Sequence, residues 1–438
     1  MSKHATAESQ SHARKLWVLA AVPFIMVLGN SMLIPVLPKM MQVMRLSLFQ
    51  VGLLITVFSI PAGVIIPIAG AVSDRIGRRR IMAPALVIYG VGGLGAGLSA
   101  WLLPRPYPWI MAFRLLQGIG AGGTYQLAMA VAGDMFQNRR RASALGFLEA
   151  ANGLGKVVSP IAGSLLALMV WFVPFFVYGV LALPAAALVW WTLREPPTAP
   201  EHGGLGGYWQ GLKATLKAKA ASMAVTFFAG SVVLFILFGV LSDLSDILEK
   251  FFGYPELVRG LLIAIPVLAS ATTSYLSGTV LQARLAAWSR PIVALGLAVV
   301  ALALAVAPAV LTVQPVWALA VLALQGIGTG AVLPAVNTLV TSATTTAERG
   351  VVTSLYGSVR FFGVALGPPL FSLAMDHRRP VFWAAAALSL TGAVLTWFFI
   401  NERQMLPKRL RQGSEAPKPK PAPASTSRSL PRFRNRLR

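Results

Sequence analysis

The sequence contains no cysteine and few charged residues. Without cysteine, disulfide bonds, thiolate metal sites and cysteine nucleophiles are all excluded. Charged residues make up only 12% of the 438 residues, whereas an ordinary soluble domain carries about a quarter. Because 56% of the residues are hydrophobic, so few charges cannot cover a surface that faces water. The composition therefore excludes an ordinary cytosolic enzyme and a disordered chain, and it indicates an integral membrane protein.

Acidic residues are also scarce, with 14 Asp and Glu against 38 Lys and Arg, a formal net charge of +24. Such an excess can indicate nucleic-acid binding, but the positions of the basic residues favour another interpretation. Most of them lie in segments that share one side of the membrane with both termini, as the positive-inside rule requires. We therefore expect a multi-pass protein of the plasma (inner) membrane, with both termini cytoplasmic and no nucleic-acid partner. Three basic residues instead fall inside predicted spans: Arg114, Lys156 and Arg360.

Twelve apolar segments are each long enough to cross the ~30 Å hydrocarbon core as a helix. Open strands cannot satisfy their backbone groups in lipid, and the alternation of a β-barrel is absent from the sequence. The sequence therefore predicts an all-α integral membrane protein. The predicted spans are residues 16–37, 51–72, 81–103, 109–132, 143–168, 170–193, 223–242, 258–279, 291–311, 315–340, 351–373 and 380–400.

The chain repeats one pattern in two halves. Gln117-Gly118-Ile119-Gly120 recurs as Gln325-Gly326-Ile327-Gly328, and the same offset takes Pro160 to Pro368. Parallel repeats of this kind indicate a transporter whose site lies near the bilayer midplane, between the two halves. The last segment is rich in Pro, Ser and Arg, so we expect it to be disordered and to lie against anionic lipid, with a partner role as the alternative. The expected parts are a cytoplasmic N-terminal segment (1–15), a six-helix bundle (16–193), a cytoplasmic central loop (194–222), a second six-helix bundle (223–400) and a basic cytoplasmic tail (401–438).

Four short motifs follow one another in the first half. Residues 28–38, 70–80, 114–120 and 155–164 read LGNSMLIPVLP, GAVSDRIGRRR, RLLQGIG and GKVVSPIAGS. Together they resemble the signatures of the major facilitator superfamily, and in particular its twelve-span drug–proton antiporter branch. The resemblance implies twelve transmembrane helices in two pseudo-symmetric six-helix bundles. It also implies proton-coupled multidrug efflux, and with it antibiotic resistance.

The resemblance also assigns roles to two of these motifs. In the family, an Asp and an Arg of the second motif join an acid at the end of the fourth span in a cytoplasmic latch that steadies the outward-facing state. A plain positive-inside loop is the alternative. The latch residues here are Gly70, Asp74, Arg75, Gly77, Arg78 and Asp134. The fourth motif forms a stripe of small residues for close helix packing, which seals the family's antiporters against leak, and comprises Gly155, Ser159, Pro160 and Gly163.

Polar residues within the spans are candidates for the substrate and proton pathway, because a charge in hydrocarbon is costly unless it faces a cavity or a partner. Glu149, Asn152 and Lys156 share one face of the fifth span. With Arg114 and Arg360 they predict a cavity holding three cations and one acid, suited to an anionic or strongly accepting group on an apolar body. Structural pairing of these cations is the alternative. The whole predicted pathway is Asn30, Arg114, Gln117, Glu149, Asn152, Lys156, Asp243, Gln325 and Arg360.

Proton coupling requires an acid that meets water from both sides. Several members of the branch carry one in the first span, where this sequence has Asn30 instead. We rank Glu149 as the first candidate for the proton-carrying acid and Asp243 as the second.

The sequence thus predicts a monomeric exporter of amphipathic small molecules in exchange for protons, with the proton gradient as energy source and no cofactor or metal. One alternative is an exporter or flippase for a single endogenous amphiphile, such as a siderophore or a lipid-linked sugar. Another is a facilitative transporter without proton coupling, and a third is a membrane sensor. No nucleotide-binding loop, catalytic triad or metal cluster in the sequence supports an enzyme or an ATP-driven pump.

Overall fold

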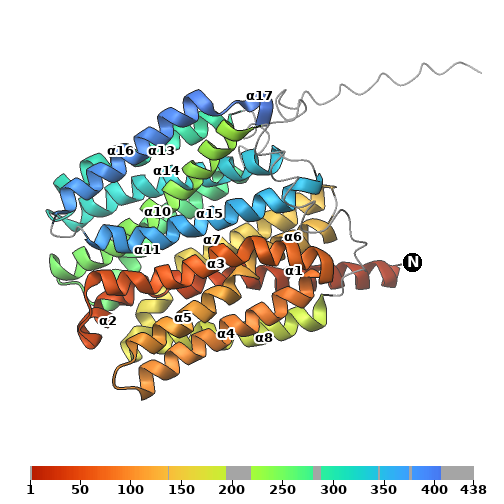
Figure 1. Cartoon of the computed structure of the whole chain (residues 1–438), viewed down its shortest axis with the longest axis horizontal. Coiled ribbons are helices and arrows are strands. Elements are labelled where there is room, and N and C mark those ends of the chain that lie inside the picture. Colours follow the sequence, from red (N-terminus) through yellow and green to blue (C-terminus); the bar gives the residue numbers. More distant parts are fainter. Residues whose placement is uncertain are drawn as a thin grey trace, which may run out of the picture.

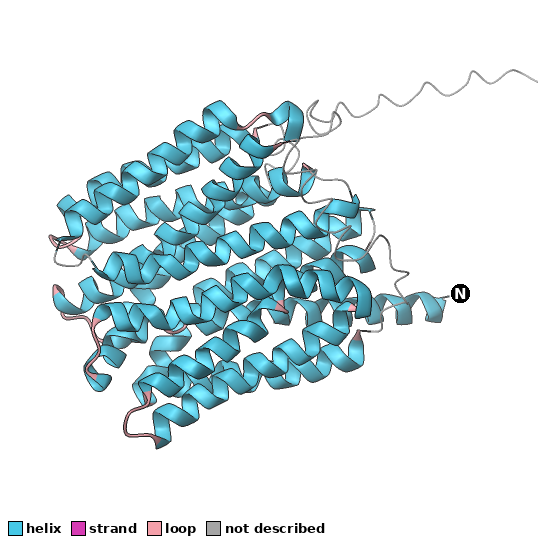
Figure 2. Ribbon diagram, viewed as in Figure 1, coloured by secondary structure: helices cyan, strands magenta, loops and turns pink. Residues whose placement is uncertain are grey.

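The computed structural model describes residues 2–136, 138–193, 219–279, 288–343, 346–373 and 377–405. Within these ranges the chain is helical and has no strand, as Figure 2 shows. The predicted all-α fold is therefore confirmed. The predicted central loop up to residue 218 and the predicted tail from residue 406 lie outside the described residues.

The first half supplies six spans. Its elements are α1 (Ser2–Ser31), η1 (Ile34–Val36), α2 (Leu37–Met44), α3 (Leu48–Ile76), α4 (Arg78–Leu102), α5 (Tyr107–Gly122), α6 (Tyr125–Met135), α7 (Asn138–Met169) and α8 (Val173–Thr192).

The second half repeats the arrangement. Its elements are α10 (Ala220–Lys250), α11 (Glu256–Thr279), α13 (Ser289–Val310), α14 (Pro315–Ser342), α15 (Thr346–Leu373), α16 (Arg378–Phe399) and the short α17 (Glu402–Met405). Ten helical segments of the described chain are long and apolar enough to cross a membrane. The pair α5–α6 and helix α15 complete the twelve predicted spans.

Two spans are interrupted, which the sequence did not predict. In the first span α1 ends at Ser31, and a single 3-10 turn precedes α2. Pro35 and Pro38 lie in this stretch, and each lacks the backbone N–H that would continue the helical bonding. In the fourth span the break falls at Thr124, whose hydroxyl donates to the Ala121 carbonyl at 2.6 Å. The break in the first span leaves the Gly29 carbonyl to accept a hydrogen bond from a side chain.

The two halves lie against each other along two helix pairs. In Figure 1, α13, α14 and α16 form one edge of the bundle, α4, α5 and α8 form the other, and α3, α7, α11 and α15 lie between them. Helix α3 packs against α15, and α7 packs against α11. Two hydrogen bonds cross the first pair: Thr56 donates to the Ala365 carbonyl at 2.6 Å, and Ser358 donates to the Gly63 carbonyl. Below, the two ends of the bundle are called the Gly77 end, near the marked N-terminus, and the Arg45 end.

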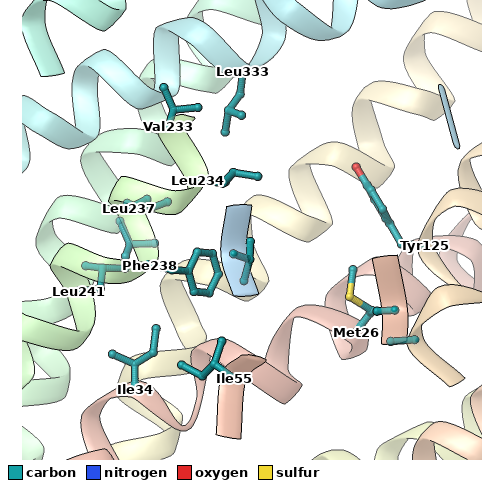
Figure 3. Close-up of a cluster of buried hydrophobic side chains, with 14 of the residues drawn as sticks. Met26, Ile34, Ile55, Tyr125, Val233, Leu234, Leu237, Phe238, Leu241 and Leu333 are labelled. Atoms are coloured by element: carbon teal, nitrogen blue, oxygen red, sulfur yellow. The ribbon is translucent and has the colours of Figure 1, made fainter. Parts of the chain in front are cut away.

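Buried apolar side chains from both halves form one continuous cluster. Figure 3 shows Ile34 and Ile55 of the first half below Phe238 of the second, with Met26 of the first half farther along the same cluster. Apolar contact across the middle of the molecule leaves few places for polar groups, so those that do lie there mark the candidate site.

Candidate functional site

A cavity lies between the two halves and holds about 560 Å³ of space not filled by atoms. Most of its wall is apolar, with Met26 and Phe58 from the first half facing Leu234 and Phe238 from the second. The polar groups on the wall are few: Asn30, Tyr125, Gln126, Asn152, Lys156 and Arg360.

Lys156 and Arg360 face the cavity from opposite halves. Lys156 lies on α7 and Arg360 on α15, where the guanidinium carbon is 5.4 Å from the centroid of the Tyr356 ring. Neither side chain forms an ion pair within 4.0 Å with any residue that the structure describes. The two cations lie within electrostatic range of each other and of Glu149. A bound anion would therefore be a direct partner for both.

Glu149 and Tyr125 form a polar pair beside this wall. The Tyr125 hydroxyl donates to Glu149 Oε1 at 2.6 Å. Tyr125 lines the cavity from α6, and Figure 3 shows it with Met26 on the side opposite Leu234 and Phe238. Tyr125 is not among the site residues predicted from the sequence. It is the only tyrosine in the predicted span 109–132, and a hydroxyl buried in a span requires a partner, which was the available signal.

Arg114 is fully buried and lies behind the cavity wall, not on it. Its guanidinium donates to the carbonyl oxygens of Leu54 at 3.0 Å and Gly29 at 2.7 Å, and to Gln117 Oε1 at 2.8 Å. It also donates to Asn30 Oδ1 at 2.5 Å. The structure thus differs from the expectation that three cations share one cavity, because two line it and Arg114 is held within the first half.

The break in the first span explains this arrangement. In an unbroken helix the Leu33 N–H would donate to the Gly29 carbonyl, but here it donates to the Asn30 carbonyl at 3.2 Å. The Gly29 carbonyl is thereby left for Arg114. Asn30 completes the group, because its amide nitrogen donates to Ser59 Oγ at 3.0 Å while its oxygen accepts from Arg114. Asn30 therefore joins Arg114 to the cavity wall.

The remaining predicted pathway residues are dispersed. Asn152 lines the cavity and donates to the Pro23 carbonyl at 3.4 Å. Gln325 is buried in α14, donates to Thr329 Oγ1 at 2.9 Å, and does not line the cavity. Asp243 lies near the Arg45 end of α10, where it accepts a hydrogen bond from Arg378 at 3.1 Å.

A network of charges closes the Arg45 end. There Lys39 of α2 lies 3.9 Å from Glu256 of α11, and Gln42 of α2 donates to Glu249 of α10. Glu249 is also paired with Arg259 of α11. These contacts join the first half to the second at this end of the bundle.

The predicted latch residues meet at the Gly77 end. Arg78 bridges two acids, with one nitrogen 3.4 Å from Asp74 Oδ1 and another 2.5 Å from Asp134 Oδ2. Gly77 alone forms the turn between α3 and α4, with a φ of 100° that favours glycine. Gly70 lies within α3 and takes no part in this turn. A Cβ there would lie 2.9 Å from Ser354 Oγ of the other half. Arg75 is exposed at the end of α3.

We expect Arg78→Gln to change the equilibrium between the conformations open at either end of the bundle more than it changes the free energy of unfolding. Both acids are more than half exposed, so losing the pairs costs under about 1 kcal/mol. If the latch favours opening at the Arg45 end, labelling of a single cysteine at Met40, which is fully buried there, should decrease in Arg78→Gln. Because the sequence contains no other cysteine, no background labelling is expected. Exposed Arg105 provides the control, Arg105→Gln, and equal labelling in both variants would contradict the latch.

The small-residue stripe packs α7 against the first span. A Cβ on Gly155 would overlap Val27 of α1, and one on Gly163 would overlap the Met32 carbonyl. Ser159 donates to the Gly155 carbonyl, and Pro160 lies inside α7 without ending it. These residues allow the close approach that the motif predicts.

Comparisons with known proteins fit this geometry. A sequence model of the Major Facilitator Superfamily matches residues 19–368 and 290–436. The Bacillibactin exporter of Bacillus subtilis is 36% identical over 397 residues, which cover 89% of this chain and 97% of that protein. Multidrug resistance protein 1 of the same organism is 27% identical, over 87% of this chain and 95% of its own length.

Solved structures show the same fold. A bacterial homologue of the human lysosomal transporter Spinster, in an inward-facing and unoccupied conformation, superposes with a TM-score of 0.70 at 18% identity. The match covers 90% of this chain and 98% of that one. The human organic anion transporter MFSD10 gives a TM-score of 0.68 at 19% identity, over 88% and 99% of the two chains.

Proposed function

This chain belongs to the Major Facilitator Superfamily, and from that premise we propose that it exports amphipathic small molecules by alternating access. The family and the fold indicate a transporter, not an enzyme. The cargo we propose carries an anionic or strongly hydrogen-bond-accepting group on an apolar body. Its polar end binds between Lys156 and Arg360, and its apolar body lies against Phe58, Leu234 and Phe238.

The single observation that supports this proposal is the pair of cations facing one apolar cavity from opposite halves. A cation in a water-poor environment requires an anion, and the described residues offer Lys156 and Arg360 no ion pair within 4.0 Å. An anionic cargo group would satisfy both cations at once. Binding it would also draw the two halves together, which is the step that alternating access requires.

The names of the relatives favour an exporter of one cargo over an exporter of many drugs. A relative with 36% identity over nearly its whole length is named for one cargo, as the Bacillibactin exporter. Relatives named for multidrug resistance match at 27%. We therefore propose a carrier for one endogenous amphiphile, with broader drug export as the second candidate.

We further propose that export runs in exchange for protons, through a monomer in the plasma membrane with both termini in the cytoplasm. The positive-inside distribution supports this orientation, and it places the Gly77 end in the cytoplasm. Exchange requires an acid, and the candidates are Glu149 beside the cavity and Asp243 near the Arg45 end.

Reconstitution into liposomes with an imposed pH gradient tests this function. Cationic, neutral and anionic amphiphiles are offered in turn while the internal pH is followed. We expect transport of the anionic compounds, together with movement of protons that is absent from protein-free liposomes. Transport of cationic compounds alone would contradict the cargo class, and transport without proton movement would contradict the exchange.

A further inference from the structure

The hydroxyl group of Tyr125 connects the acid Glu149 to the cavity. Tyr125 lines the cavity and donates to Glu149 Oε1 at 2.6 Å, whereas Glu149 does not itself line it. A phenol has a single proton to donate, so Tyr125 cannot serve Glu149 and a cargo at the same time. The state of Glu149 therefore decides whether Tyr125 offers a donor to the cavity.

The charge of Glu149 also affects how strongly the cavity attracts an anionic cargo. Lys156 and Arg360 are both within electrostatic range of Glu149, so an ionised carboxylate offsets part of their positive charge. A proton on that carboxylate removes the offset and leaves the two cations to the cargo. A neutral carboxylic acid is also a weaker acceptor than an anion, so the Tyr125 hydroxyl then gains more by donating to the cargo.

We propose that a proton on Glu149 and an anionic cargo bind together, and that Tyr125 transmits the state of Glu149 to the cargo. This inference rests on the proposed function, because it requires a cargo with a negative charge. The proton binds to the carboxylate of Glu149, the Tyr125 hydroxyl turns from that carboxylate to the cargo, and no covalent bond other than the O–H bond changes. Tyr125 is thus a specificity-determining residue of the site.

The proton on Glu149 and the cargo favour each other's binding, and this restricts which acid can exchange protons for cargo. Exchange requires that the proton and the cargo exclude each other, whereas at Glu149 each favours the other. For an anionic cargo, exchange must therefore use another acid, and Asp243 is the remaining candidate. Asp243 is 2% exposed, is held by Arg378 and does not line the cavity.

The titratable surroundings of Glu149 are defined by the helices around α7. Tyr125 on α6, Lys156 on α7, and Tyr356 and Arg360 on α15 form the cluster with it. The other described charged and phenolic side chains on helices packed against α7 are Arg14, Lys15, Asp134, Tyr178, Glu256, Arg259 and Tyr275.

Binding of a matched pair of probes to the full chain in lipid nanodiscs tests the proposal. Anilinonaphthalene sulfonate is an amphiphile whose sulfonate stays ionised, and phenylnaphthylamine is nearly the same molecule without the sulfonate. Binding to empty nanodiscs is subtracted. We expect the affinity of the wild type for the sulfonate to rise on the order of tenfold once the pH is low enough for Glu149 to take up a proton, with little change for the neutral probe.

Three variants separate the parts of the proposal. Glu149→Gln should bind the sulfonate at every pH as tightly as the wild type does in acid. Tyr125→Phe should lose most of the gain in acid, because the donor is absent. Tyr107→Phe, whose hydroxyl donates to the Gln50 carbonyl at 2.9 Å away from the cavity, should keep the wild-type profile.

Two different failures can be distinguished. If the wild type prefers the neutral probe at every pH, the proposed function fails and the inference fails with it. If the sulfonate is preferred but Glu149→Gln keeps the wild-type pH dependence, the titrating group is another one, such as Lys156, and only the inference is overturned. Tyr125→Phe with an unchanged profile would likewise overturn the role of the hydroxyl.

Discussion

Replacing either Lys156 or Arg360 with glutamine is expected to lower the affinity for an anionic amphiphile by about tenfold to a hundredfold. Each substitution removes a charge-assisted hydrogen bond, which contributes about 1.5–3 kcal/mol where water is excluded. Affinity for a neutral analogue of the same shape should change little, because the apolar wall is unaltered. Equilibrium binding of the sulfonate and its neutral counterpart to the purified variants measures both effects.

The double variant tests whether the two cations bind the same group. Lys156 and Arg360 approach the cavity from opposite halves, so a shared anion couples them, and the loss in the double variant should differ from the sum of the single losses. Arg105→Gln is the matched control, because it removes an exposed cation far from the cavity wall. Equal loss of affinity for both probes would show that the variants damage the fold and would contradict a specific role for the charges.

Replacing Arg114 with methionine is expected to destabilise the protein by at least about 3 kcal/mol. The side chain is fully buried, and its removal leaves the Gly29 and Leu54 carbonyls, Asn30 Oδ1 and Gln117 Oε1 without their donor. Each buried polar group left unsatisfied costs about 1–3 kcal/mol. The midpoint of thermal unfolding in detergent, read by the recovery of monodisperse protein, measures the loss.

Two further variants sharpen the test of Arg114. Arg114→Lys should recover little, because a single ammonium group cannot reach acceptors that the planar guanidinium contacts in four directions. Arg105→Met removes an exposed arginine and should leave the midpoint unchanged. An Arg114→Met protein as stable as the wild type, but without proton movement, would contradict the structural role and favour a role in the predicted proton pathway.

The sequence predicted the structure correctly where hydropathy, helical periodicity or a family motif determines the position of a residue. Span length and hydropathy were enough for the twelve helices, because a chain in lipid has few other ways to satisfy its backbone. Helical periodicity placed Asn152 and Lys156 on one face of α7, and both line the cavity. The family resemblance grouped Asp74, Arg78 and Asp134 in one latch, and Arg78 contacts both acids.

The rest depends on how helices are rotated and broken, which a single sequence does not state. The sequence predicted that Arg114 and Lys156 face one cavity, yet Arg114 lies behind the wall and Lys156 lies on it. The difference arises because the break after Ser31 supplies an acceptor at Gly29 that the periodic pattern does not show. Tyr125 was missed for the same reason, since its role depends on the partner that α7 brings to it.

Transport of the matched probe pair into everted membrane vesicles tests the central claim most directly. Vesicles containing the wild type are predicted to accumulate anilinonaphthalene sulfonate above vesicles without the protein, and to transport phenylnaphthylamine much less. Vesicles containing the double variant Lys156→Gln and Arg360→Gln are predicted to lose that preference. Preferential transport of the neutral probe by the wild type, or an undiminished preference for the sulfonate in the double variant, would contradict a cavity that selects its cargo with these two cations.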